Sequence, residues 1–211
     1  PVEQEIARTA PVIKAIRAAG IDTPISIDTR KAPVARAALA AGAGLINDVS
    51  AFAFDPAMQG LAAETDVPVC LMHAQGLPET MQDNPDYADA LLDVYDSLET
   101  SVSVAEAAGI PREKILVDPG IGFGKRDPHN MALIGRISLF HALGCPILLG
   151  VSRKASIGRI ANIPDPHGRG PASAAIGLWA LGQGVQMLRV HDTQVHRQMI
   201  ALWRAAAEGQ A

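Results

Sequence analysis

The sequence predicts an α/β fold in which parallel strands and helices alternate strictly. Short apolar, β-branched runs, typical of strands buried on both faces, alternate with longer stretches of helical periodicity. Six such βα units follow one another after an opening helix. Repeated βα units form either a doubly wound sheet or a (β/α)8 barrel, whereas a sandwich or a helical bundle would lack the alternation.

The opening helix is expected over residues 1–20, and strands and helices then follow in pairs. We expect strands at Ile25–Ile27, Leu45–Val49, Val67–Met72, Ile115–Val117, Ile147–Val151 and Met187–Val190. We expect the intervening helices at Pro33–Ala41, Pro56–Glu64, Tyr87–Ala108, Pro128–Leu143, Pro171–Gln183 and Thr193–Ala207. Proline begins several of these helices and glycine follows several. Proline is common at the first position of a helix, and glycine is common just after the last. No linker-like stretch interrupts the pattern, so we expect one domain over residues 1–211.

Composition narrows the classes of protein. The 211 residues are 48% hydrophobic with a net charge of −4, which argues against disorder and against a nucleic-acid partner. The apolar runs are shorter than the ~18–20 residues of a membrane span, and no secretory signal opens the chain. Cys70 and Cys145 lie in apolar runs without metal-binding spacing, which indicates buried free thiols in a cytoplasmic protein.

Each predicted strand ends in ionisable or amide side chains. In order along the chain these are Asp28, Asn47 with Asp48, His73, Asp118, the run Ser152-Arg153-Lys154, and Arg189 with His191. Ligands bind at the carboxyl ends of the strands in parallel α/β folds. One polar strand end is ordinary helix capping, but six in succession predict a ligand site.

The residue types at these ends indicate a ligand with two different parts. Two carboxylates, Asp28 and Asp118, and the Asn47 amide match the N–H donors and carbonyl acceptors of a flat polar heterocycle. The cationic group fits phosphate or carboxylate and comprises Arg153, Lys154, Arg189 and His191. Because fixed cations stabilise charge that grows in a transition state, the set predicts group transfer with an anionic leaving group.

The glycine-rich run 120–125 leaves two interpretations open. It resembles a phosphate loop, but Pro119 stands where the first Walker glycine belongs and Arg126 replaces the Ser/Thr. It is therefore either a loop that a ligand approaches closely or a plain turn. His73 and His191 lack metal-binding spacing, and Ser152 lacks the G-x-S-x-G elbow of a nucleophile. We expect hydrogen-bonding histidines and no covalent nucleophile.

Taken together, the strand ends resemble those of the dihydropteroate synthases, the folate-pathway members of the pterin-binding family. The matching segments are SIDTRK (26–31), IND (46–48), LMHAQG (71–76), DPGIGFGK (118–125), SRK (152–154) and RVHD (189–192). Any one of them is weak evidence, whereas the ordered set is specific.

The resemblance implies a (β/α)8 barrel that joins 6-hydroxymethyl-7,8-dihydropterin diphosphate to 4-aminobenzoate in an SN1-like displacement. It also implies Mg²⁺ accompanying the diphosphate and a homodimer formed through the late helices. By matched position, the pterin-binding residues are Asp28, Asn47, Asp118 and Lys154, with Met72, Phe123 and Gly150 lining the pocket. Ser152 and Arg153 complete the substrate-binding set, and the catalytic group is Lys154 with the diphosphate-binding pair Arg189 and His191.

The sequence departs from the family pattern at three places. Ile121 stands where a phenylalanine is common, and Ala155 stands where a serine is common. The motifs of the family's first two strands, including its metal-contacting asparagine, are not found in this sequence. We therefore expect about six of the eight βα units, and no metal ligand among the residues present.

Two alternative functions stay open at this point. A pterin-dependent methyltransferase belongs to the same family, but its reaction has no diphosphate for the Ser-Arg-Lys and Arg-Val-His-Asp segments to hold. A pterin-binding protein without catalytic activity is the other alternative, suggested by the missing first motifs.

Overall fold

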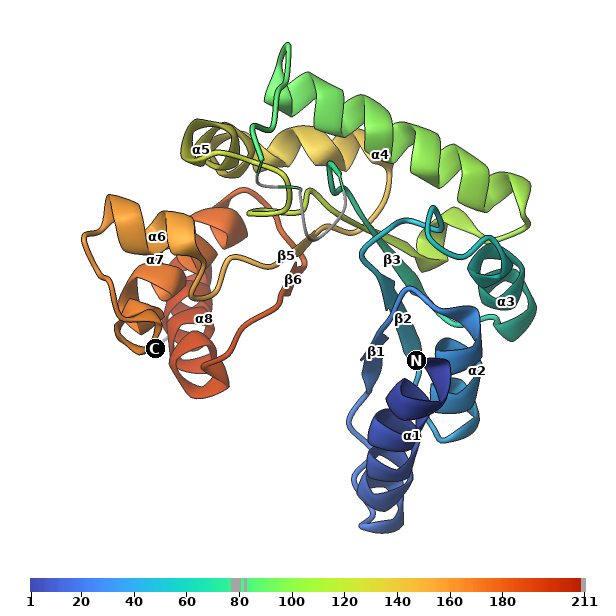
Figure 1. Ribbon diagram of the computed structural model, residues 1–211. Coiled ribbons are helices and arrows are strands. Elements are labelled where there is room, and N and C mark those ends of the chain that lie inside the picture. Colours follow the sequence, from blue (N-terminus) through green and yellow to red (C-terminus); the bar gives the residue numbers. More distant parts are fainter. Residues whose placement is uncertain (77–80, 82, 210–211) are drawn as a thin grey trace. The chain divides into compact units, whose positions relative to one another are not determined.

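The computed structural model describes residues 1–76, 81 and 83–209, which form two compact units (Figure 1). The first unit comprises Pro1–His73, Asp96–Asp118 and Leu143–Cys145. The second comprises Ala74–Tyr95, Pro119–Ala142 and the chain from Pro146 onward. The expected single domain over residues 1–211 stays a prediction, and each unit is described by itself.

The first unit is built on a parallel sheet of four strands in the order β1-β2-β3-β4. The strands are β1 (Ser26–Asp28), β2 (Leu45–Asp48), β3 (Val69–Met72) and β4 (Ile115–Asp118). The helices between them are α2 (Ala32–Ala40), α3 (Ala57–Thr65) and α4 (Ala90–Ala107, whose residues before Asp96 belong to the second unit). Helix α1 (Val2–Ala18) precedes β1, and a 3-10 turn, η1 (Arg112–Lys114), precedes β4. Figure 1 shows α2 and α3 lying along one side of this sheet.

The strands form here because their side chains are apolar on both faces. Ile46, Val69 and Ile115 are fully buried in adjacent strands and pack side by side. Such two-sided burial is the usual state of parallel strands covered by helices. Arg17 of α1 joins this helix to the turn after α2, because its Nε and Nη2 donate to the Gly42 carbonyl at 3.1 and 2.9 Å.

The second unit carries a two-stranded parallel sheet, β5 (Leu148–Leu149) and β6 (Met187–Leu188). Its helical segments are α5 (Asp127–Gly135), η2 (Ile137–Leu143, whose last residue belongs to the first unit), α6 (Ala155–Ile160), η3 (Pro166–Arg169), α7 (Gly170–Gly182) and α8 (Thr193–Glu208). The pairing continues past β6, because the Arg189 amide donates to the Leu149 carbonyl at 3.0 Å. The residues that follow β5 and β6 therefore leave the sheet at the same edge.

Six strands occur among the described residues, at the six expected places. β5 and β6 are shorter than expected, at two residues each. The single helix expected over Pro128–Leu143 is wrong, because α5 ends at Gly135 and a 3-10 helix follows Arg136. Glycine is a poor helix former, and Arg136 leaves helical geometry at φ −128°. Helix α6 was not among the expected helices, since six residues are too few to show helical periodicity.

Within the described residues, no helix has both the length and the apolar character needed to cross a membrane.

Candidate active site

Four of the predicted site residues lie on one face of the sheet in the first unit. Asp28 is paired in register with Asn47, and Met72 is paired with Asp118. Asn47 is also paired with Cys70, two residues before Met72 on β3. Because side chains alternate between the faces of a strand, these five residues project from the same face. The sheet thus brings together both carboxylates and the amide at its carboxyl edge, as the sequence predicted.

The Cys70 thiol lies in a negatively charged environment on this face. Burial raises the pKa of Cys70 well above its usual value, and the negative charges of Asp118, Asp28 and Asp48 raise it further. Cys70 is fully buried and, like Cys145, is a free cysteine, as expected from the sequence. A thiol held in its protonated form is a poor nucleophile. The face therefore offers hydrogen-bond acceptors and no covalent chemistry from Cys70.

Asp48 has a different role from its neighbour Asn47. It is fully buried, and its Oδ1 accepts hydrogen bonds from the Ser50 amide at 2.8 Å and the Ser50 hydroxyl at 2.6 Å. Its Oδ2 accepts from the Phe52 amide at 2.9 Å. These bonds hold a turn in which Ala51 and Phe52 both have positive φ, at 48° and 71°. Asp48 therefore shapes the loop after β2.

In the second unit, the glycine-rich run 120–125 is a loop whose polar groups are held by buried side chains. Lys125 is 2% exposed and donates from Nζ to the carbonyls of Gly120 and Phe123 at 3.0 and 3.1 Å. Asn130 accepts from the Gly122 amide at 2.8 Å. Gly120, Gly122 and Gly124 have φ of 67°, 81° and 63°, values that glycine adopts readily. Lys125 thus stabilises the loop itself, unlike the lysine of a Walker loop.

The loop carries Phe123, which contacts a second predicted residue. The Lys154 Nζ lies 4.0 Å from the centre of the Phe123 ring. A Cβ at Gly122 would lie 3.4 Å from the Lys154 Cδ, so the lysine stem runs closely past the loop. A cation over an aromatic face is attracted electrostatically. Of the two interpretations of the glycine run, this contact favours a loop that belongs to the binding site.

A cavity of about 580 Å³ lies at the carboxyl edge of β5 and β6. It contains six of the predicted residues: Gly150, Ser152, Arg153, Lys154, Arg189 and His191. Ala155, Pro166 and Arg169 complete its lining. The Nε of Arg153 is buried and has no hydrogen-bond partner in the described part of the chain. A pocket walled by three arginines and a lysine, with a histidine beside them, is suited to a phosphate or carboxylate group.

Ser152 and His191 contact each other within this cavity. The Ser152 hydroxyl accepts a hydrogen bond from the His191 amide at 3.2 Å and lies 3.0 Å from the ring Nδ1. Ser152 is 6% exposed, whereas His191 is exposed. The sequence predicted Ser152 as a substrate-binding residue, and this geometry makes it also a support for His191.

Arg169 is a cavity residue that the sequence analysis missed. Arg169 does not come directly after a predicted strand, because α6 separates it from β5. The pattern of polar residues at strand ends therefore gave no reason to select it. Its guanidinium is hydrogen-bonded to backbone carbonyls, including that of Arg153 at 3.0 Å. No local pattern in the sequence indicates such a contact across 16 residues.

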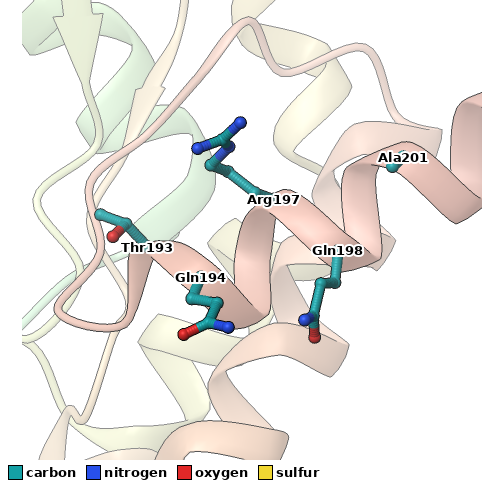
Figure 2. Close-up of a pocket in the computed structure, with 5 residues that line it drawn as sticks. All are labelled: Thr193, Gln194, Arg197, Gln198 and Ala201. Atoms are coloured by element: carbon teal, nitrogen blue, oxygen red, sulfur yellow. The ribbon is translucent and has the colours of Figure 1, made fainter.

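A second cavity of the same unit, about 530 Å³, lies along α8 (Figure 2). Its lining residues all belong to this helix: Thr193, Gln194, Arg197, Gln198 and Ala201. None of them is a predicted site residue, and the lining has one charged side chain. This cavity lacks the convergent polar groups that mark the first one as the candidate site.

The residues that the structure describes contain no group of three or more His, Cys, Asp or Glu side chains arranged to hold a metal ion. The donor set of the cavity is cationic, apart from Ser152 and the imidazole of His191. These residues do not fit a metal centre of protein ligands.

The sheet of the first unit carries hydrogen-bond acceptors for a polar ring, and a cationic pocket follows β5 and β6 in the second unit. This fold and these groups define a pterin-binding enzyme of the α/β barrel class. Residues 1–191 match the family described as pterin binding enzyme. The chain belongs to this family.

Three similar proteins are dihydropteroate synthases. The chain is 40% identical over 207 residues to that of Synechocystis, which covers 96% of this chain and 71% of the relative. The Yersinia pestis enzyme, solved with a sulfonamide drug, is 38% identical with a TM-score of 0.93, covering 99% of this chain and 75% of that one. The Xanthomonas albilineans enzyme, solved with 7,8-dihydropteroate, is 39% identical with a TM-score of 0.91, covering 98% and 75%. These likenesses confirm the predicted (β/α)8 barrel class, of which the described residues contain six parallel strands.

Proposed function

We infer that this chain condenses 6-hydroxymethyl-7,8-dihydropterin diphosphate with 4-aminobenzoate, giving 7,8-dihydropteroate and diphosphate. The observation that carries this function is the cationic cavity after β5 and β6, found in a chain about 40% identical to dihydropteroate synthases over nearly its whole length. The reaction is a transferase step of folate biosynthesis.

The acceptor face of the first unit supports recognition of the pterin ring. A carboxylate can accept two parallel N–H bonds from the 2-amino edge of a pterin, which is the geometry that an arginine otherwise supplies to a carboxylate. We assign this bond to Asp118, which is 7% exposed. Asp28 and Asn47 would meet other polar edges of the ring, and Met72 would pack against its face.

The cationic cavity supports departure of the diphosphate. The C–O bond between the pterin methylene and the diphosphate breaks, and its electron pair leaves with the diphosphate. Arg153, Arg189 and His191 stabilise the charge that grows on the leaving oxygen. Lys154, above Phe123, would be the cation shared between the pterin and this end of the site.

The second half of the reaction needs no nucleophile from the protein. The amino lone pair of 4-aminobenzoate attacks the pterin-methylene cation, forms the C–N bond, and the nitrogen then loses a proton to solvent. The Cys70 thiol takes no part, because its raised pKa keeps it protonated. This order of events is the SN1-like displacement that the resemblance implies.

Magnesium is proposed as a companion of the diphosphate. Mg²⁺ commonly keeps several waters and binds through substrate phosphates with few protein ligands. Such binding is compatible with a cavity that offers no protein cluster for a metal. Calorimetric titration of the pterin diphosphate with and without Mg²⁺ tests it, and equal affinities would contradict the proposal.

We also propose a cytoplasmic homodimer. Exposed apolar side chains on the last two helices support the assembly: Trp179 on α7 is 56% exposed and Leu202 on α8 is 73% exposed. Two buried free cysteines support a reducing compartment. Sedimentation of the wild type and of a Leu202→Glu variant tests the interface, and an unchanged oligomeric state in the variant would exclude this surface.

The function is tested by incubating the purified protein with the pterin diphosphate and 4-aminobenzoate and measuring dihydropteroate by chromatography. We expect product formation that a sulfonamide inhibits. Binding of the pterin diphosphate without product would favour a non-catalytic pterin-binding protein. Transfer of a methyl group from a methylated folate to a corrinoid, without dihydropteroate formation, would favour the methyltransferase.

A further inference from the structure

Arg169 lies in the wall of the cationic cavity, but its N–H groups are bonded to the protein backbone. Its Nε donates to the Ile163 carbonyl at 3.0 Å, and its Nη2 donates to the Pro164 carbonyl at 2.6 Å. Its Nη1 donates to the carbonyls of Arg153 at 3.0 Å and Lys154 at 3.5 Å. One guanidinium therefore ties the end of the segment after α6 to the peptide units of two predicted substrate-binding residues.

The peptide that Arg169 holds has an unusual conformation. Arg153 has φ of 58°, in the left-handed region that residues other than glycine adopt at a cost. Its amide donates to the Ser173 hydroxyl at 3.0 Å, and Ser173 in turn donates to the Arg169 carbonyl at 2.6 Å. Arg153 is thus held at its amide by Ser173 and at its carbonyl by the Arg169 side chain. Such double restraint is what keeps a strained residue at a functional site in place.

Gly158 leaves the space that the Arg169 guanidinium occupies. A Cβ at this position would lie 2.4 to 2.6 Å from the Arg169 Nε, Cζ and Nη2. Gly158 is buried within α6, where alanine would otherwise be the better helix former. The absence of a side chain at Gly158 therefore serves the position of Arg169.

We propose that Arg169 is a positioning residue, which sets the places of the Arg153 and Lys154 side chains by holding their carbonyls in the space that Gly158 provides. The inference builds on the proposed function, because it concerns residues of that site. In a direct role, by contrast, the Arg169 charge itself would attract the anionic substrate. The fork of four hydrogen bonds favours the positioning role, since an ammonium group cannot reproduce its geometry.

The test compares three variants with the wild type in steady-state kinetics. Arg169→Lys keeps the positive charge but removes the guanidinium and its hydrogen bonds. Arg169→Met removes the charge as well. Gly158→Ala keeps the Arg169 side chain but displaces its guanidinium. We expect all three to lower kcat/KM by about tenfold to a hundredfold, chiefly through a higher KM for the pterin diphosphate. Loss of folded protein would instead lower kcat and leave KM unchanged.

Two controls separate position from stability. Gly60→Ala lies inside α3, where a Cβ would meet no atom within 4 Å, and should leave KM unchanged. Arg17→Lys breaks a similar set of carbonyl bonds that holds no site residue, and should lower the melting temperature without raising KM. Gly158→Ala also loses the Arg169 carbonyl bonds, so its melting temperature is compared with that of Arg17→Lys, and only Gly158→Ala should raise KM.

Hydrogen exchange supplies a readout that does not depend on catalysis. We expect faster exchange in a peptide covering residues 153–158 in Arg169→Lys and Gly158→Ala. A wild type that makes no dihydropteroate would contradict the proposed function and leave this measurement to decide on Arg169. Wild-type KM in Arg169→Lys together with a raised KM in Arg169→Met would overturn the positioning role in favour of direct charge. Wild-type KM and exchange in Gly158→Ala would overturn it as well.

Discussion

The Ser152 hydroxyl is hydrogen-bonded to both the backbone amide and the ring Nδ1 of His191. The amide can only donate, so the hydroxyl oxygen accepts that bond. We infer that the hydroxyl in turn donates its proton to the lone pair of the ring Nδ1, because this arrangement uses the one donor that the amide contact leaves over. Neutral His191 therefore carries its own proton on Nε2, which makes the other side of the ring a hydrogen-bond donor.

This pairing predicts that Ser152→Ala changes the tautomer of His191. Without the hydroxyl, nothing described in the structure holds the Nδ1 lone pair, and the ring redistributes between its two neutral forms. We expect the affinity for the pterin diphosphate to fall by about 1 kcal/mol, the usual net value of one neutral hydrogen bond. The ¹⁵N shifts of the His191 ring, assigned with His191→Gln, measure the tautomer directly.

The control for this prediction is Ser103→Ala, an exposed serine on α4, which should leave the ring signals unchanged. A wild-type spectrum with the His191 proton on Nδ1 would contradict the hydrogen-bond direction inferred here.

The places of the strands and their polar ends were predictable because both are local features. An apolar run followed by a polar residue is visible in the sequence at Ile115–Asp118, for example, and the structure has β4 at these residues. Parallel pairing then places such ends at one edge of a sheet without knowledge of any long-range contact. For Asp28 and Asn47 the register pairs the two residues directly.

Other features depend on contacts between residues far apart and could not be predicted in the same way. Arg169 reaches the Arg153 carbonyl across 16 residues, and the space for it comes from Gly158. The role of Lys125 was open for a different reason, because its contacts are local. A Gly-Lys pair is compatible with a phosphate contact, and only its burial against the carbonyls of its own loop shows that it stabilises that loop.

Asp118→Asn is predicted to weaken binding of the pterin ring. The substitution keeps the shape of the side chain but removes the charge that accepts the two N–H bonds. We expect a loss of about 1.5–3 kcal/mol, the range for a hydrogen bond to a charged group. Calorimetry with 6-hydroxymethyl-7,8-dihydropterin measures it, with the exposed Asp22→Asn as a matched control. Unchanged affinity in Asp118→Asn would show that the ring binds elsewhere.

Arg189→Ala is predicted to weaken binding of the diphosphate part of the substrate and to spare binding of the pterin part. Arg189 lines the cationic cavity and follows β6, so its loss should weaken binding of the pterin diphosphate by at least about tenfold. Binding of the free hydroxymethyl pterin, which lacks the anion, should change little. The two titrations are compared in the wild type, in Arg189→Ala and in the exposed control Arg8→Ala. Equal losses for both ligands would rule out the diphosphate assignment.

Tyr87 supports the glycine loop and gives the protein a pH-dependent contribution to stability. Its hydroxyl donates to the Gly124 carbonyl at 2.7 Å. Burial raises the pKa of Tyr87 to about 12, and the negative charge of Asp93 adds to the increase. The folded protein therefore keeps this proton between pH 10 and 12, where the unfolded chain loses it.

The sign of this effect follows from the proton count. Because the folded state binds the proton more tightly, the contribution of Tyr87 is fully present below pH 10 and declines as pH rises toward 12. From pH 9 to pH 11 we expect the free energy of unfolding to fall by about 1 kcal/mol more in the wild type than in Tyr87→Phe. Urea unfolding at the two pH values measures this difference. Absorbance at 295 nm should show a tyrosine ionising near pH 12 that disappears in Tyr87→Phe; a tyrosine titrating near pH 10 in its place would refute the assignment.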